Sequence, residues 1–149
     1  MRAVVQRVSR AEVWENGVIL GRIGRGFVVL LAVGKDDEES DLDYVFNKVV
    51  NVRIFEDELG KMNQSLVEVG GQLLVVSQFT LYGDCRKGRR PSFMDAAPPD
   101  KAEAFYERFI ERAKQTGIVV SSGRFQSMMD VHLVNSGPVT ILLDSKKSF

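Results

Sequence analysis

The sequence predicts an α+β fold in which a strongly curved, barrel-like β-sheet carries two main helices packed on one side. Three observations predict this class. Most of the chain consists of short runs rich in β-branched residues, separated by turn residues. Only two segments have apolar residues at helical spacing. A length of 149 residues with 44% apolar residues fits a single domain over residues 1–149.

The first part of the chain predicts three strands. The stretch "AVVQRVSRAEVWE" is rich in β-branched residues and ends at Asn16-Gly17, a pair that favours a tight hairpin turn. The stretch "VILGRIGRG" then returns from this turn. "FVVLLAVG", from Phe27 to Gly34, is apolar throughout, as expected of a strand that is covered on both faces.

A first helix is expected after the acidic stretch "KDDEES". Ser40 followed by Asp43 fits a helix start, because such side chains accept hydrogen bonds from the first free N–H groups. The apolar residues then fall on one face of a helix: Leu42, Val45, Phe46, Val49 and Val50.

The rest of the chain predicts more strands, one long loop and a second helix. "RIFEDELGKMNQSLVEVGGQLLVVSQFTL" is expected to form three strands with turns at Leu59-Gly60 and Gly70-Gly71. "YGDCRKGRRPSFMDAAPP" has no periodicity and is expected to be a loop. A helix from about residue 100 to residue 116 should end before Gly117. "IVVSSGRF", "DVHLVNSG" and "VTILLD" are the last expected strands.

Charge and targeting signals place limits on partners and location. Lys plus Arg equals Asp plus Glu, with twenty of each, so a polyanion would have to be met by a local basic patch. A single cysteine excludes an internal disulfide and fits a reducing compartment. The N-terminal stretch does not resemble a secretory leader, and no apolar run is long enough for a membrane span. We therefore expect a cytoplasmic protein without membrane contact.

The shortage of histidine and cysteine limits the chemistry. Because His132 and Cys85 are the only residues of their types, one chain cannot build a His/Cys metal cage. A catalytic triad that needs histidine could use only His132. We therefore expect no metal and no cofactor, and chemistry that relies on positioning, backbone donors and hydroxyl groups.

Polar residues end the apolar run of residues 73–76. If that strand continues, Ser77 and Gln78 point to opposite faces and Phe79 shares a face with Ser77. Ser77, Gln78 and Thr80 could bind a ligand, since strand ends often carry binding groups. They could equally satisfy neighbouring backbone groups, as hydroxyls near turns commonly do.

The one dense basic cluster of the chain follows directly. Arg86, Lys87, Arg89 and Arg90 surround Gly88. Such a cluster can contact phosphate groups, and the glycine lets the backbone approach them closely. The alternative is a solvated loop without a partner.

The stretch "LVNSGPVTILLD" joins two apolar runs through Asn-Ser-Gly-Pro. One reading is a hairpin turn, and the other is a backbone segment presented to a ligand. Proline removes a backbone donor and is confined to strand edges, strand starts and bulges. On these residues alone a trans Gly137-Pro138 bond is expected, because few X–Pro bonds are cis.

Taken together, "SQFTLYGDCRKGRRPSF" and "NSGPVT" resemble the signature segments of the D-aminoacyl-tRNA deacylases, the D-Tyr-tRNA(Tyr) deacylase family. "MRAVVQRV", "RIFEDELGKMNQSL" and "GGQLLVVSQFTLYGD" resemble the same family, so the resemblance covers nearly the whole chain. It implies a cytosolic homodimer that hydrolyses the ester between a D-amino acid and the 3′-terminal adenosine of tRNA. Such an enzyme performs chiral proofreading in translation.

The resemblance also implies roles for individual residues. The S-Q-x-T motif is matched at Ser77, Gln78 and Thr80, as catalytic residues, with Phe79 binding substrate. Further substrate-binding positions are implied at Phe125, Asn135, Gly137, Pro138, Val139 and Thr140, and tRNA binding at Arg86, Lys87, Arg89 and Arg90. In the family the Gly-Pro bond is cis and enters the active site of the partner subunit.

A rigid pair of carbonyls near the substrate Cα could accept the amino group of a D-amino acid and leave no space for an L side chain. Glycine could enter as well, so glycyl-tRNA is an expected substrate. Thr80 could be the nucleophile, with Gln78 or backbone N–H groups near Phe79 binding the oxyanion. Alternatively, the terminal ribose 2′-hydroxyl could activate water while the protein positions the ester.

The chain departs from the family pattern at several positions. Gln126-Ser127-Met128-Met129 stands where Gly-Ala-Asp-Met is common, Ser136 where Asp is common, and Gly83 where a small residue such as Ala is common. Two other functions compete with deacylation. One is a non-catalytic RNA-binding module that uses the basic cluster, and the other is a general esterase that uses Cys85 or Thr80.

Overall fold

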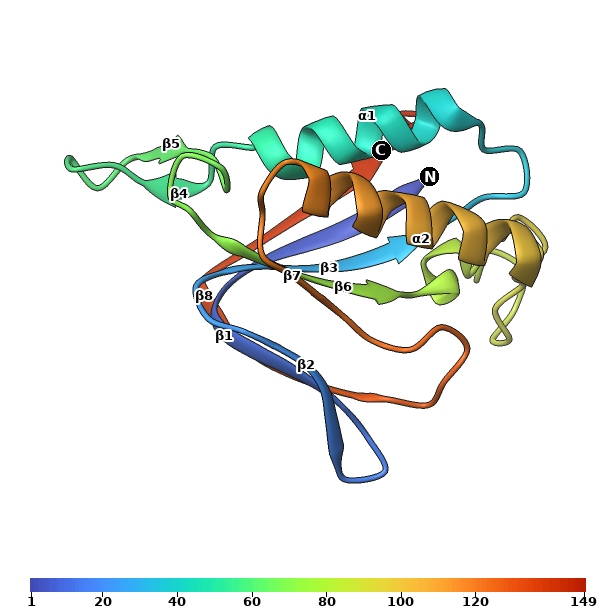
Figure 1. Cartoon of the computed structure of the whole chain (residues 1–149). Coiled ribbons are helices and arrows are strands. Elements are labelled where there is room, and N and C mark those ends of the chain that lie inside the picture. Colours follow the sequence, from blue (N-terminus) through green and yellow to red (C-terminus); the bar gives the residue numbers. More distant parts are fainter.

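A computed structural model describes residues 1–149, and Figure 1 shows a mixed β-sheet with two α-helices lying across one of its faces. The predicted α+β architecture with two main helices is confirmed. In chain order the elements are β1 (Arg2–Glu15), β2 (Val18–Ile23), β3 (Gly26–Ala32), α1 (Glu39–Asn51), β4 (Phe55–Glu56), β5 (Met62–Gln64), β6 (Gln72–Ser77), the short 3₁₀ helix η1 (Phe79–Tyr82), α2 (Pro99–Gln115), β7 (Val120–Ser122) and β8 (Asp130–Asp144).

The long strand β1 organises the sheet. It pairs antiparallel with β3 along residues 2–8, with β2 along residues 11–15, and with β8 along nearly its whole length. β6 continues the sheet in parallel from β3, and β7 from β6. The Ser121 hydroxyl in β7 donates a hydrogen bond to the carbonyl of Arg22 in β2, 2.9 Å away. The last short strand therefore returns to the first hairpin, and the sheet curves into a nearly closed barrel.

The helices cover the sheet with their apolar stripes. The predicted inward positions of the first helix, from Leu42 to Val50, are all buried. Phe46 of α1 meets Phe109 of α2 edge to face, with ring centroids 5.5 Å apart. Both rings join the buried faces of β1, β3 and β6 in one apolar cluster of 22 residues. Burial of this kind is the main force that holds the helices on the sheet.

Several boundaries differ from the sequence-based expectation. The first helix begins at Glu39, because the Asp41 carboxylate accepts the Glu38 N–H at 2.8 Å and thereby closes the first turn. The strand expected to run through "SQFTL" stops at Ser77, and the chain turns into η1. The facing predicted for Ser77, Gln78 and Phe79 in a continuing strand is therefore wrong.

The last part of the chain also differs. We expected two separate strands on either side of Gly137-Pro138, but β8 continues through the pair and pairs with β1 on both sides of it. The Gly137-Pro138 bond is cis, as the family resemblance implies, so the trans turn expected from the residues alone is wrong. None of the helices combines the length and apolar content that crossing a membrane requires.

Candidate functional site

A cavity of about 870 Å³ opens where β6 ends and η1 begins. Its wall includes Ser77, Gln78, Phe79 and Thr80, and also Phe125 from the segment between β7 and β8. The four predicted residues of the first motif and the predicted substrate-binding residue Phe125 thus lie together. Helix α2 and the end of β3 complete the wall, mostly with apolar side chains. Its size lies within the range of roughly 300–1,000 Å³ that is usual for small-molecule pockets.

The turn after β6 brings two polar side chains into contact. The side-chain amide of Gln78 donates a short hydrogen bond to the Thr80 hydroxyl oxygen. This contact lies where β6 gives way to η1, between Gln78 just before the turn and Thr80 within it. The Thr80 oxygen is occupied as an acceptor, and its proton remains free to point toward a ligand. Phe79 is 55% exposed and packs edge to face on Phe93, with centroids 5.0 Å apart.

The cavity wall is almost without ionisable groups. Tyr106 is the one ionisable side chain among the lining residues, and its hydroxyl donates to the Val75 carbonyl at 2.9 Å. Burial raises the pKa of Tyr106 to about 12, so it stays neutral near physiological pH. His132 packs against Trp14 at the far end of β1, and the exposed Cys85 does not line the cavity. The wall therefore holds no side chain that could act as a general base near neutral pH.

The Gly-Pro motif forms a bulge in β8. Between two paired positions, β1 contributes only Arg7 while β8 contributes the four residues 136–139. The Asn135 side chain closes the base of this bulge: its oxygen accepts the Val139 N–H at 3.1 Å, and its nitrogen donates to the Thr140 hydroxyl at 3.0 Å. Gly137 and Pro138 are both exposed at its tip. We refer to residues 136–139 as the bulge.

The guanidinium group of Arg7 on β1 holds the bulge in place. Its Nε donates to the Ser136 carbonyl at 3.1 Å, and a second guanidinium nitrogen donates to the Ile54 carbonyl at 2.6 Å. A side chain at position 137 would be crowded, since an added Cβ would lie 2.9 Å from the Arg7 guanidinium and 2.8 Å from the Val139 side chain. Gly137 also has a φ of +123°, which favours glycine.

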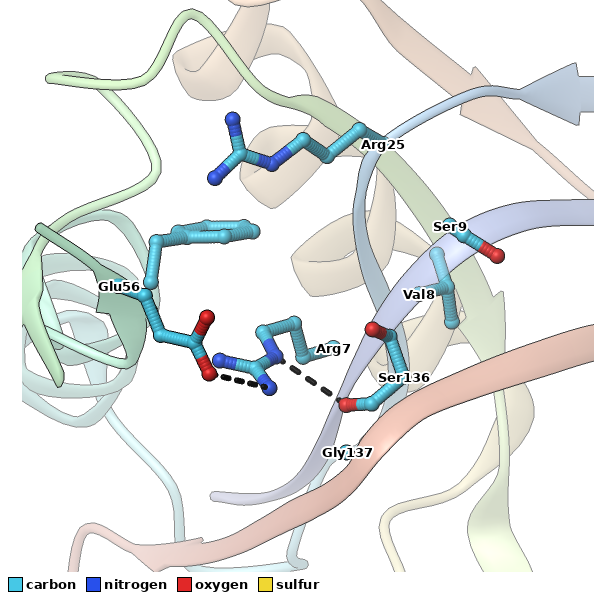
Figure 2. Close-up of a pocket in the computed structure, with 8 residues that line it drawn as sticks. Arg7, Val8, Ser9, Arg25, Glu56, Ser136 and Gly137 are labelled. Atoms are coloured by element: carbon cyan, nitrogen blue, oxygen red, sulfur yellow. Dashed lines mark hydrogen bonds and ion pairs between the residues drawn. The ribbon is translucent and has the colours of Figure 1, made fainter. Parts of the chain in front are cut away.

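The bulge borders a second, smaller pocket of about 360 Å³, shown in Figure 2. None of the residues that line this pocket lines the larger cavity. Within one chain the structure therefore does not bring the predicted substrate-binding residues of the second motif, Asn135, Gly137, Pro138, Val139 and Thr140, to the cavity that holds Thr80.

The basic cluster lies on a loop whose ends are joined. Asp84 and Ser92 exchange two backbone hydrogen bonds of 2.8 and 2.9 Å. These bonds hold together the two ends of the part of the expected long loop that carries the basic cluster. Arg86 forms an ion pair with Asp84 at 2.8 Å, and this bond lowers the pKa of Asp84 to about 2. Lys87, Arg89 and Arg90 are exposed and form no ion pair. Three of the four predicted tRNA-binding cations are thus uncompensated.

Sequence reasoning missed two groups of residues. Arg7 was not singled out, although it occupies a buried position in the alternating pattern of β1, where a charge needs partners. Tyr106, which lines the cavity from α2, was not singled out either. Gln126, Ser127 and Met128, at which the sequence departs from the family pattern, all line the cavity.

No group of three or more His, Cys, Asp or Glu side chains is placed to hold a metal ion.

Comparisons with known proteins show which proteins this chain resembles in sequence and in fold. A sequence model described as D-Tyr-tRNA(Tyr) deacylase matches residues 4–144. The D-aminoacyl-tRNA deacylases of Kosmotoga olearia and Thermotoga petrophila are 62% and 59% identical to the chain over 149 residues, with each sequence covered completely.

Solved structures agree in fold. A structure titled c-Myc DNA unwinding element binding protein superposes with a TM-score of 0.92 at 42% identity, covering 97% of this chain and 98% of the other. A probable eukaryotic D-amino acid tRNA deacylase superposes with a TM-score of 0.83, covering 96% and 98% of the two chains. At 23% identity, this second match supports the fold alone.

The chain is a hydrolase that acts on the ester bond of an aminoacyl-tRNA. It belongs to the D-Tyr-tRNA(Tyr) deacylase family, and its substrates are D-aminoacyl-tRNAs. The recognition made from the two sequence motifs is confirmed. A non-catalytic RNA-binding module does not fit this family, and an esterase that uses Cys85 does not fit a cavity that Cys85 does not line.

Proposed function

We propose that the enzyme releases D-amino acids from tRNA, rejects the L forms, and thereby proofreads chirality in translation. The observation that carries this proposal is the neutral cavity around Gln78 and Thr80, with no carboxylate in its wall. An α-amino group bound there has no acidic side chain to receive it, so its partners must be oxygen atoms of hydroxyls, amides or main-chain carbonyls. Selectivity then depends on where those oxygens stand around Cα.

The chemical step is hydrolysis assisted by the substrate. Because the cavity wall has no general base, the terminal ribose 2′-hydroxyl is the nearest group that can relay a proton. Water attacks the ester carbonyl carbon and passes a proton to the 2′ oxygen. The bond from this carbon to the 3′ oxygen breaks, and the 2′-hydroxyl proton moves to the 3′ oxygen. The products are the free D-amino acid and tRNA with an intact 3′ end.

In this scheme Thr80 and Gln78 position the ester, and neither becomes covalently modified. The Gln78 amide fixes the Thr80 oxygen, whose proton can then donate to the substrate. Backbone N–H groups at the start of η1 are available to the developing oxyanion, because the first backbone bond within this turn is donated by Leu81 to Gln78. Ser77 stands at the end of β6 on the same wall.

The chiral filter is supplied by the bulge of a partner subunit. Two features support a homodimer with shared active sites. The bulge does not reach the cavity of its own chain, although both motifs belong to one family signature. The outer edge of β8, 15 residues long, pairs with nothing within the chain, and Val134 and Leu142 on it are 43% and 58% exposed. A long unpaired edge of this kind offers free N–H and C=O groups with which another chain can pair.

The carbonyl oxygens of Gly137 and Pro138 would then face the substrate Cα in the partner's cavity. They accept the amino group of a D-amino acid and occupy the space that an L side chain needs. The bulge is held for this role at both of its ends, because Arg7 donates to the Ser136 carbonyl and Asn135 accepts the Val139 N–H. Glycine has no side chain to exclude, so glycyl-tRNA is a second substrate.

The exposed loop cations Lys87, Arg89 and Arg90 attract the tRNA backbone. Action on tRNA and the exposed free Cys85 both fit the cytoplasm, where thiols stay reduced.

The test is a deacylation assay with the purified full-length protein. D-Tyr-tRNA and L-Tyr-tRNA are incubated in parallel, with Cys85→Ser as a matched control that keeps the cavity unchanged. We expect rapid release of D-tyrosine, survival of the L ester, release of glycine from glycyl-tRNA, and full activity of the control. Equal hydrolysis of both tyrosyl esters would overturn the chiral filter.

A further inference from the structure

The smaller pocket beside the bulge contains a positive charge that the proposed reaction does not use. Arg7 and Arg25 line this pocket together with a single carboxylate, Glu56. Figure 2 shows Arg7 and Glu56 joined by a dashed line and Arg25 standing apart from them. Two guanidinium groups against one carboxylate leave the pocket with an excess positive charge.

The two arginines have different tasks. Arg7 is nearly buried and uses its nitrogens on the carbonyls of Ser136 and Ile54, with its third nitrogen 3.9 Å from Glu56. Arg7 is therefore occupied in holding the backbone. The Arg25 side chain forms no hydrogen bond and no ion pair within the chain, and only its backbone carbonyl accepts a bond, from the Gln72 N–H at 3.0 Å. Its charge is consequently available to a ligand.

The Arg25 guanidinium is held in place by an aromatic ring, so its N–H donors remain free. Its guanidinium lies over the ring of Phe55, 5.0 Å from the centroid, and that ring is stacked on Phe27 in the core with centroids 4.9 Å apart. Stacking on a ring fixes the plane of a guanidinium and leaves the N–H groups at its rim free. A planar fork of free donors is the arrangement that binds phosphate oxygens well. The Ser9 hydroxyl, exposed on the same wall, adds a further donor.

The position of this pocket identifies the ligand. Gly137 forms part of its wall, so the pocket moves with the bulge. If the bulge enters a partner's cavity, as proposed above, the pocket opens beside the acceptor end of the tRNA that occupies that cavity. The chemical group next to a 3′-terminal adenosine is a phosphodiester of the preceding nucleotides.

We infer that Arg25, stacked on Phe55, binds a backbone phosphate of the tRNA acceptor end whose ester lies in the partner subunit's cavity. This inference rests on the proposed function, since it requires the bulge to act across the dimer. It assigns the smaller pocket to substrate binding and Arg25 to positioning. Arg25 does not touch the reacting ester.

The experiment compares binding of two ligands that carry no amino acid by the full-length protein. The trinucleotide CpCpA carries backbone phosphates, whereas adenosine carries none. We expect Arg25→Ala to weaken CpCpA binding about tenfold, the usual scale for losing a charged hydrogen-bonded contact, and to leave adenosine binding unchanged. Arg25→Lys should recover part of the loss, because it keeps the charge but not the planar fork. The matched control is Arg22→Ala, which removes an arginine already paired with Glu12 at 2.8 Å.

Two results would overturn the inference. One is equal affinity of Arg25→Ala and the natural protein for CpCpA. The other is an effect of Arg25→Ala on binding of inorganic phosphate with none on CpCpA, which would make the pocket a site for free anions. Deacylation of D-Tyr-tRNA by the same preparation is measured separately. Its absence would count against the proposed function, while the binding comparison would still decide the role of Arg25.

Discussion

The Arg7 guanidinium donates to the main-chain carbonyl of Ser136 at a distance of 3.1 Å. One buried side chain on β1 thereby holds the exposed bulge of β8 in position. A second bond from Arg7 to the Ile54 carbonyl, 2.6 Å long, ties the bulge to the segment before β4. The proposed chiral filter is therefore a backbone feature whose geometry depends on a residue outside both sequence motifs.

Removing Arg7 should loosen the filter. Arg7→Ala leaves two carbonyls without their partner and lets the bulge move, so we expect the D-over-L ratio of kcat/KM for tyrosyl-tRNA to fall about tenfold or more. The free energy of unfolding should fall by about 1–3 kcal/mol, the range for a buried polar group left unsatisfied. Arg10→Ala, at an exposed position on the same strand, is the matched control. An unchanged ratio in a loosened, folded Arg7→Ala protein would refute this role.

The absence of a base in the cavity leads to a prediction about Thr80. Thr80→Ala should keep kcat within about tenfold of the natural enzyme, because it removes a single hydrogen bond to the ester, which is worth about 1 kcal/mol, and no covalent intermediate. Replacing the terminal adenosine of D-Tyr-tRNA by 2′-deoxyadenosine, with the ester on the 3′ oxygen, should lower kcat by about 10²–10⁴, the usual contribution of a proton relay. Single-turnover rates measure both effects. Loss of all activity in Thr80→Ala together with normal hydrolysis of the deoxy substrate would instead indicate a threonine nucleophile.

The four cations of the basic loop should not contribute equally. Arg86 is already compensated by Asp84, whereas Arg89 has no ionic partner. Arg89→Ala should therefore raise KM for D-Tyr-tRNA and lower the salt slope of kcat/KM by about 0.7–0.9, the value for one phosphate contact. Arg86→Ala should change both quantities less. Titrations of rate against salt concentration test this, and equal effects of the two variants would contradict it.

The pH dependence of stability should reflect Asp41 in α1. Burial alone would raise the pKa of Asp41, but hydrogen bonds from the Lys146 ammonium and the Glu38 N–H outweigh burial and lower it to about 2. A carboxyl group with a lowered pKa in the folded state stabilises the protein above its unfolded pKa, and this contribution disappears as the pH falls toward 2.

Asp41→Asn should lower the free energy of unfolding by about 1–2 kcal/mol near neutral pH, a range reduced because the Lys146 partner is half exposed. The difference from the natural protein should shrink between about pH 4 and pH 2. Urea unfolding over this pH range measures it, with Asp43→Asn as the exposed control on the same helix. A difference that stays constant down to the lowest pH would rule out the assigned pKa.

Part of this molecule was predictable from local patterns. The alternating and continuous apolar runs predicted the strands, and helical spacing predicted both helices. Ser77 to Thr80, at the polar strand end, could be grouped from the sequence because they are neighbours along the chain, and they line the cavity together. The course of β8 was not predictable, since a Gly-Pro pair usually ends a strand. The long-range bond from Arg7 and the local bonds of Asn135 hold the bulge while the strand continues.

The central claim is that each active site combines the cavity of one subunit with the bulge of the other. Two damaged proteins test it: Ala102→Trp, which fills the cavity, and Gly137→Val, whose side chain would collide with Val139 and Arg7. Each alone should be inactive on D-Tyr-tRNA. The two are then unfolded, mixed in equal amounts and refolded together.

In a mixed dimer of these two proteins, one site would carry both defects and the other site none. Activity should therefore return to about a quarter of the natural level, because half of the dimers are mixed and each has one intact site. A mixture that dimerises but stays inactive would show that the bulge serves its own chain, and would contradict the account.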